Sequence, residues 1–86
     1  MDESRHFANF GRPEWTRYRD ELARRGIVLP PGDAGSMSRG GIQVHYTFRE
    51  RDRTLSFTLT QLPFWVSSAL VWRAIEASVN DIEALR

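Results

Sequence analysis

The stretch from Thr54 to Trp72 contains no charged side chain, although 27% of the sequence is Asp, Glu, Lys or Arg. Exposed β-branched and aromatic side chains are an aggregation liability in water, so we expect this stretch to be buried or covered. It contains the second half of a predicted β-hairpin and the start of the last predicted helix. If its strand lies at a sheet edge, either another part of the fold or a second protein chain must cover it.

Two runs of alternating apolar and polar residues predict the strands of that hairpin. The apolar positions are even-numbered in residues 42–48 and odd-numbered in residues 55–59. A period of two is typical of a strand with one buried face. Both apolar sets share a face if Phe48 pairs with Leu55, which leaves residues 50–53 as a four-residue turn. The same register pairs Tyr46 with Phe57 and Val44 with Leu59.

One helix is predicted on each side of the hairpin. The first runs from Pro13 to about Arg25, because Pro suits a first helical position and Gly26 favours a helix end. The second begins near Pro63 and runs to about Leu85. Apolar residues at helical spacing predict one buried face on each helix. These residues are Trp15, Tyr18 and Leu22 in the first helix, and Val71, Trp72, Ile75, Val79, Ile82 and Leu85 in the second.

Together these elements predict an α+β fold, in which the long C-terminal helix packs on one face of the sheet. Residues 27–29 are the candidate for a third antiparallel strand, whereas residues 32–41, rich in Gly and Ser, are expected to form a mobile loop. Residues 1–12 are expected to be a flexible tail and residues 13–86 a single small domain. A core of this size supplies only about 3–5 kcal/mol of net stability, so self-association would be a natural supplement.

The composition narrows the classes of function. The chain has no Cys, and neither His6 nor His45 is predicted to have a metal-ligand partner on its own element, so we expect no enzyme and no cofactor or metal site. All twelve basic residues are Arg, which is typical of a GC-rich bacterial genome. The net charge of +1 predicts no general attraction to nucleic acid or to a membrane surface. The acidic N-terminus and the lack of an apolar run of about 20 residues predict a cytoplasmic protein without a membrane span.

A surplus of apolar residues leads to the main functional hypothesis. The last helix carries a second apolar sector beside its core face, and two aromatic residues lie at its predicted start. Aromatic side chains are enriched at interface hot spots, although they also fill small cores. The chain is therefore predicted to be a non-enzymatic protein–protein interaction module that binds itself, as a homodimer, or a different protein partner. The candidate interface residues are Phe64, Trp65, Val66, Leu70 and Ala74.

The Arg-rich hairpin tip supports an alternative hypothesis, nucleic-acid binding through phosphate contacts. The candidate contact residues are Arg39, Arg49, Arg51 and Arg53. Glu50 and Asp52 lie between these arginines and nearly cancel their field. A solubilising turn is therefore the simpler interpretation of this charge run.

The predicted order of helix, three strands and helix resembles double-stranded-RNA-binding domains in topology. Such domains grip phosphates with a basic start to their last helix. Residues 63–68 of this chain, which occupy that position, contain no basic side chain. The resemblance is therefore one of topology alone, and we do not expect nucleic-acid binding by that route.

Overall fold

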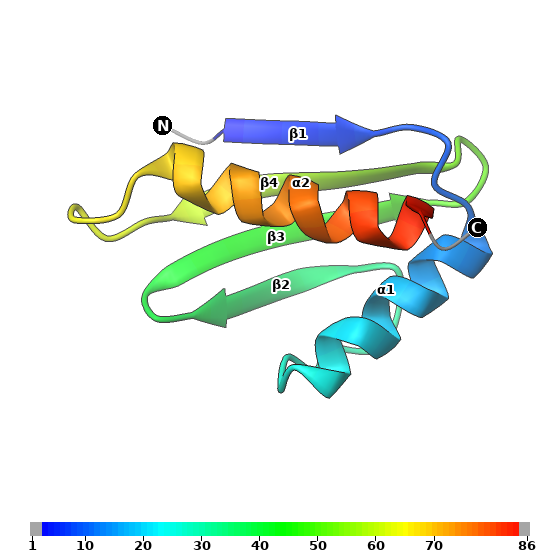
Figure 1. The fold of residues 1–86 in the computed structure, drawn as a ribbon, viewed down its shortest axis with the longest axis horizontal. Helices are drawn as coiled ribbons and strands as arrows, with labels where there is room; N and C mark the ends of the chain where they lie inside the picture. The colour runs from blue at the N-terminus through cyan, green and yellow to red at the C-terminus, as the bar shows by residue number, and fades with distance from the viewer. Residues whose placement is uncertain (1–2, 85–86) are drawn as a thin grey trace.

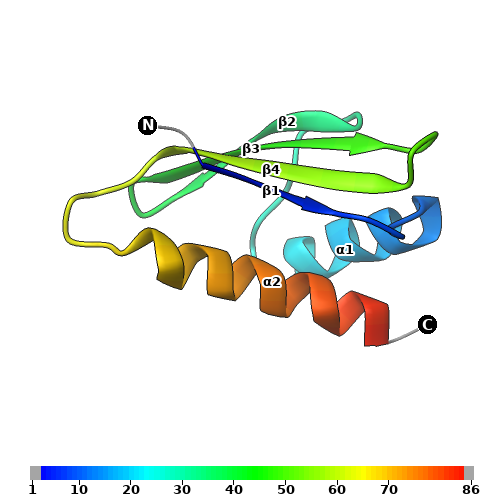
Figure 2. The same cartoon turned by 90° about the horizontal axis from the view of Figure 1, so that it is seen from above.

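A computed structural model describes residues 3–84, which form four strands and two helices. In chain order the elements are β1 (Glu3–Phe7), α1 (Arg12–Arg24), β2 (Ala34–Arg39), β3 (Ile42–Arg49), β4 (Thr54–Gln61) and α2 (Ser68–Ala84). The strands form one antiparallel sheet in the order β1-β4-β3-β2 (Figure 1). Both helices lie on the same face of this sheet, and its other face is open (Figure 2). The predicted α+β fold is therefore confirmed.

The central hairpin has the register predicted from the alternating pattern. Phe48 lies opposite Leu55, Tyr46 opposite Phe57 and Val44 opposite Leu59. Residues 50–53 form the turn, in which the Arg53 N–H donates to the Glu50 carbonyl at 3.2 Å. The buried side chains of both strands face the helices, because a period of two places alternate residues on one face.

The two edge strands correct the prediction. The third strand is not residues 27–29, which connect α1 to β2 without strand structure, but residues 34–39, which were predicted to be part of a mobile loop. They pair with β3 through a two-residue turn of Gly40 and Gly41, whose φ angles are 61° and 84°. Glycine adopts these angles without a side-chain clash, and such turns suit the twist of a hairpin.

The fourth strand comes from the segment predicted to be a flexible tail. Residues 3–7 pair with β4 along their whole length. The charge-free strand β4 therefore lies inside the sheet, between β1 and β3, and has no free edge. Coverage by the fold and coverage by a second protein chain were the two alternatives, and the fold itself covers this strand. It does so with β1 and not with residues 27–29.

The outer strand β1 carries charged side chains on the face that packs against α2. Trp72 Nε1 donates to Glu3 Oε1 at 3.1 Å, and the Arg5 guanidinium carbon lies 5.0 Å from the centre of the Trp72 ring. Charges that point inward from an edge strand discourage pairing with another chain. This edge of the sheet is therefore protected by its own sequence.

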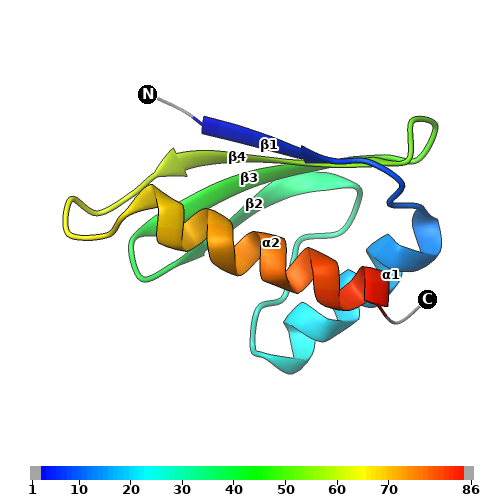
Figure 3. The ribbon, with the colours of Figure 1, turned by 45° about the horizontal axis from the view of Figure 1, so that its top comes forward.

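The core lies between the sheet and the two helices. Trp15 stacks on Phe48, with ring centres 5.5 Å apart and planes 13° apart. The predicted core faces of both helices are confirmed within the described residues: Trp15, Tyr18, Leu22, Trp72, Ile75, Val79 and Ile82 are buried, and Val71 is half-buried. The predicted helix end at Leu85 lies outside the described residues. α1 and α2 lie side by side (Figure 3), and the hydroxyl oxygens of Tyr18 and Ser78 are 2.9 Å apart between them.

The start of α2 also differs from the prediction. The helix begins at Ser68 and not at Pro63, because Ser67 caps it by accepting a hydrogen bond from the Ala69 N–H at 3.2 Å. Phe64 and Trp65 therefore lie in the loop that joins β4 to α2. This shift of five residues decides where the two aromatic side chains point.

Candidate protein-binding site

Two aromatic side chains stand exposed at one end of the molecule. Phe64 is 97% exposed and Trp65 is 73% exposed, and their rings meet edge to face with centres 5.1 Å apart. They belong to the loop between β4 and α2, which projects beyond the sheet (Figure 1). We call these two residues the aromatic tip. Neither ring contributes to the core, although both are large enough to do so.

The loop that carries the aromatic tip is held at both ends. Pro63 packs closely on the β2–β3 turn, since a Cβ atom added at Gly41 would lie 3.0 Å from Pro63 Cγ. The Val66 N–H donates to the Pro63 carbonyl at 3.0 Å, which closes a turn around the two aromatic residues. Ser67 then caps α2, which begins at Ser68. The tip is therefore presented by an ordered turn.

An apolar groove of about 380 Å³ lies beside the tip, between α2 and the β2–β3 hairpin. One wall belongs to α2 and the residue before its cap, and the other to the sheet and the connection after α1. The α2 wall contains Val66, Leu70, Val71, Ala74 and Ile75. The opposite wall contains Ile27, Met37, Ile42 and Val44. Arg39, the charged residue of the lining, has its Nη1 atom 3.5 Å from the Arg25 carbonyl.

The structure places the five predicted interface residues in the groove and in the loop that leads into it. Val66, Leu70 and Ala74 line the groove, and Phe64 and Trp65 form the aromatic tip next to it. Sequence reasoning missed the opposite wall of the groove, because residues 34–39 were interpreted as a loop. The signal that could have found it is the Gly-Gly pair between Met37 and Ile42, which is typical of a two-residue hairpin turn.

The four arginines proposed for nucleic-acid contact do not form one patch. Arg49, Arg51 and Arg53 lie at the β3–β4 turn. Arg39, the last residue of β2, pairs with Ile42 at the other end of β3, which is about 23 Å from Arg49 at about 3.3 Å per residue. Arg39 lines the apolar groove instead. Within the β3–β4 turn, Glu50 accepts a hydrogen bond from Arg12 at 3.1 Å, so an acidic group stays ordered among the three arginines.

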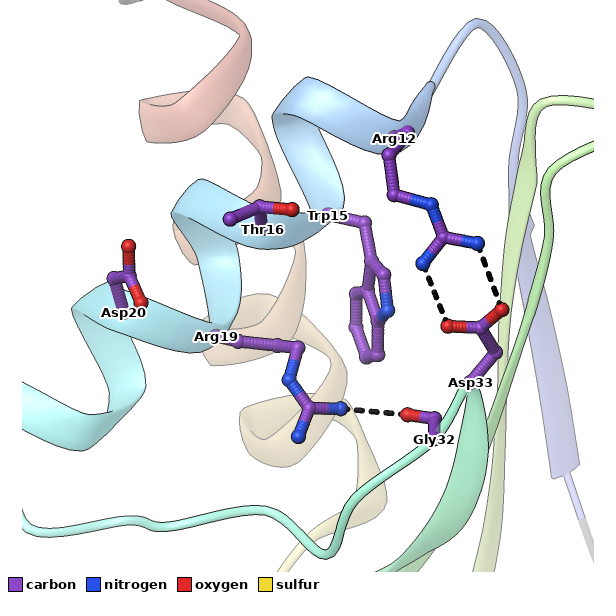
Figure 4. Close-up of a pocket in the computed structure, with 7 residues that line it drawn as sticks. All are labelled: Arg12, Trp15, Thr16, Arg19, Asp20, Gly32 and Asp33. Carbon is purple, nitrogen blue, oxygen red and sulfur yellow. Dashed lines mark hydrogen bonds and ion pairs between the residues drawn. The ribbon is translucent and has the colours of Figure 1, made fainter.

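A second hollow lies between α1 and the start of β2 (Figure 4). Arg12 donates to both carboxylate oxygens of Asp33 at 2.8 and 2.9 Å, and this contact lowers the pKa of Asp33. Arg19 donates to the carbonyls of Gly32 and Pro30 at 2.7 and 2.8 Å. Figure 4 shows these guanidinium groups turned toward their partners within the chain. The two arginines therefore clamp the α1–β2 connection, and this role accounts for their positions without a ligand.

Both histidines lie on the open face of the sheet and bond to serine hydroxyls across the strands. The Nδ1 atoms of His6 and His45 lie 2.8 and 3.2 Å from the Oγ atoms of Ser56 and Ser36. A nucleophilic serine needs a base that a third group orients and a donor for the developing oxyanion. Both pairs are exposed on a sheet face that no helix covers. We therefore interpret the two pairs as cross-strand contacts. A separate question is metal binding: within residues 3–84, no group of three His, Cys, Asp or Glu residues could hold a metal ion.

Comparison with known proteins adds no relative from which a function could be transferred. No protein-family model, no curated protein and no solved structure matches this chain. Among the described helices, none is long and apolar enough to cross a membrane.

Proposed function

We propose that this chain is a non-enzymatic protein–protein interaction module, and that the aromatic tip and the apolar groove are its binding site. The observation that carries the proposal is the exposure of Phe64 and Trp65 directly beside a groove with aliphatic walls. Buried aromatic anchors surrounded by smaller apolar contacts are typical of interface hot spots. Leu70, which is 59% exposed at the groove, extends the same surface.

The free energy gained by burying this apolar surface exceeds the cost of association only if the tip and the groove both contact the partner. The two aromatic side chains bury about 300–500 Å² when covered, at about 150–250 Å² each. At about 25 cal/mol per Å², this gives about 7–13 kcal/mol before any cost is subtracted. Association costs about 4–15 kcal/mol, so the tip alone gives a weak complex. Contacts in the groove supply the additional apolar area that a stable complex needs.

The chemistry of the surface favours protein over nucleic acid as the partner. The aromatic tip belongs to the charge-free segment, and Arg39 is the charged residue of the groove lining. Phosphate recognition uses several Lys or Arg side chains that neutralise successive phosphates. A surface of this kind instead accepts aliphatic or aromatic side chains of another polypeptide.

Site-specific photo-crosslinking in the native cells tests this proposal. A photoreactive phenylalanine analogue at Trp65 or Leu70 is expected to give a protein adduct of one defined mass, identified by mass spectrometry. The same analogue at Thr47, which alternates with the buried Tyr46 and Phe48 in β3 and so lies on the opposite face of the sheet, serves as the matched control. The adduct at Trp65 is expected to disappear when Ala74→Arg places a charge in the groove.

Two results would contradict the proposal. One is the lack of any protein adduct at Trp65 and Leu70. The other is an adduct at Trp65 that forms equally well with Ala74→Arg, because the groove would then take no part in binding. Either result would show that the aromatic tip and the apolar groove do not form one binding site.

A further inference from the structure

We propose that the partner at this surface is a second copy of the chain, and that each copy places its aromatic tip in the apolar groove of the other. This inference rests on the proposed function, because it uses the same binding site. It adds the identity of the partner and the symmetry of the complex. The two copies are related by a two-fold axis, so that every contact occurs twice.

The aromatic tip adjoins the groove within each copy of the chain. Val66 follows Trp65 directly in the sequence and lines the groove, so projection and hollow share one end of the molecule. The exposed fractions of Phe64 and Trp65 show that the tip does not fill the groove of its own chain. The aromatic tip and the groove beside it are both apolar. When two copies face each other across a two-fold axis, the tip of each copy can therefore enter the groove of the other.

The charges of the chain permit two copies to pair through this surface. The net charge of the chain is only +1, so two copies repel each other weakly. The tip brings no charge into the groove of the partner, since residues 54–72 have none. Arg39 at the groove supplies a guanidinium that can face an incoming ring, a contact that occurs three times among residues 3–84. The three examples are Arg5 on Trp72, Arg12 on Phe48 and Arg19 on Trp15, at 5.0, 5.0 and 5.4 Å.

The area buried by a reciprocal contact is sufficient for a specific interface. Two aromatic tips bury about 600–1,000 Å² in total, at about 150–250 Å² for each ring. The walls of the two grooves expose less area than the rings, so the sum is roughly 1,000–1,300 Å². This range lies at the lower end of specific protein–protein interfaces. A reciprocal dimer buries twice the area of a single tip in a single groove.

Sedimentation equilibrium of the purified chain, from micromolar to submillimolar concentration, is the primary test. A transition from monomer to dimer is expected, without larger species, because a two-fold contact closes on itself.

Quenching of tryptophan fluorescence by iodide reports on the aromatic tip over the same concentration range. Trp15 and Trp72 are 1% and 3% exposed, so iodide reaches mainly Trp65, and its quenching is expected to fall as the dimer forms.

A complementation experiment tests the reciprocal exchange. A tip variant, with Phe64→Ser and Trp65→Ser, keeps the groove, and a groove variant, Ala74→Arg, keeps the tip. Each is expected to be monomeric alone, and an equimolar mixture is expected to form a heterodimer that is weaker than the wild-type dimer, since one tip still fills one groove. Ala23→Arg makes the same substitution at an exposed position of α1 and is expected to dimerise normally. All substituted positions are exposed, and circular dichroism checks that the variants fold.

The outcomes separate this inference from the proposed function. A strict monomer whose Trp65 stays open to iodide overturns self-pairing, whereas the photo-crosslinks at Trp65 and Leu70 to a different protein would still support the binding site. A dimer that persists in the tip or groove variant places the contact elsewhere and overturns the inference. Two monomeric variants that fail to combine overturn the reciprocal exchange. The lack of any crosslink at the site overturns the proposed function itself.

Discussion

Gly35 is the residue whose small size is most directly required by the packing. A Cβ atom at this position would lie 2.8 Å from Tyr46 Oη and 3.2 Å from Tyr46 Cζ. The Tyr46 ring is fully buried, and its hydroxyl has no hydrogen-bond partner within residues 3–84. The tyrosine therefore cannot move outward easily, and glycine is needed in β2 because of this close approach.

We predict that Gly35→Ala lowers the free energy of unfolding by about 1–3 kcal/mol, the usual cost of overpacking a core. The cost is expected to be smaller in a Tyr46→Phe background, because the nearest contact atom is then absent. Tyr46→Phe alone is expected to be nearly neutral or stabilising, since it removes an unpaired buried hydroxyl. Urea unfolding of the four proteins measures the coupling as a double-mutant cycle. Equal costs in both backgrounds would show that the hydroxyl is not the obstacle.

The Arg12–Asp33 ion pair makes a pH-dependent contribution to stability. The hydrogen bonds from Arg12 lower the pKa of Asp33 in the folded state. The stabilisation is therefore present above the ordinary carboxyl pKa of about 4 and is lost as the pH falls below it. We predict that Asp33→Asn is less stable than the wild type at pH 7 and that the difference shrinks in acid. Because both side chains are more than a third exposed, added salt is also expected to reduce it.

Urea unfolding at neutral and acidic pH, each at low and high salt, measures this difference in the free energy of unfolding. The Asn variant keeps the Asp33 backbone carbonyl, which accepts a hydrogen bond from the Phe48 N–H at 2.6 Å. A difference between wild type and variant that stays constant as the pH falls would show that the carboxylate charge does not cause it.

At the scale of elements, the β2–β3 turn connects the sheet to the aromatic tip. Gly40 and Gly41 both have positive φ, but a Cβ atom would contact another residue only at Gly41, where Pro63 lies. We predict that Gly40→Ala and Gly41→Ala each cost about 1–2 kcal/mol, the penalty of a left-handed conformation. Gly41→Ala is also expected to displace Pro63 and loosen the tip.

Amide hydrogen exchange of residues 64–67 distinguishes the two glycine variants. Faster exchange in this loop is expected for Gly41→Ala and not for Gly40→Ala, which serves as the control because a Cβ there meets open space. The same exchange rates in both variants would mean that the Pro63 contact does not order the loop.

The hairpin was predictable because two physical constraints agree on it. The alternating pattern fixes which face of each strand is buried, and the parity of the turn then leaves one sensible register. The edge strands gave no such signal: β2 contains Gly, Ser and a single Met among its six residues, and β1 carries Glu3 and Arg5 on its inner face. Their place in the sheet depends on backbone pairing and on Trp72, which lies 69 residues from its partner Glu3. Local sequence patterns do not contain this information.

The candidate site was predictable only on its helical side. Leu70 and Ala74 were identified because helical spacing leaves them off the core face of α2. The aromatic tip was ambiguous in the sequence, because a helix start at Pro63 would have turned the two rings differently. The cap at Ser67 resolves this, and nothing before it in the sequence distinguishes Ser67 from Ser68 as the cap.

At the scale of the whole molecule, Phe10 joins the sheet to the first helix. Its side chain is fully buried and meets the Tyr18 ring edge to face at 6.1 Å, and its N–H donates to the Arg53 carbonyl at 2.9 Å. We predict that Phe10→Ala costs about 3–5 kcal/mol, the usual loss for a buried aromatic residue. This equals the whole margin of about 3–5 kcal/mol that a domain of this size has.

The Phe10 variant is therefore expected to be largely unfolded at room temperature, as measured by circular dichroism and thermal unfolding. Phe64→Ala is the matched control, because the same side chain is removed where it is almost fully exposed. The control is expected to keep the thermal midpoint of the wild-type monomer. A folded Phe10→Ala protein would mean that the first residues contribute little to the core.

The pairing of β1 with β4 has a consequence for the order of events on the ribosome. The first strand of this sequence needs a partner that follows much later, since Ser4 lies opposite Thr58 and 54 residues separate them. The β2–β3–β4 meander can form without β1, because its contacts are local. The N-terminal segment must wait, with Phe7 and Phe10 in water, until β4 is outside the exit tunnel. In a nascent chain, this is the interval in which another protein could capture the N-terminal segment before its own β4 does.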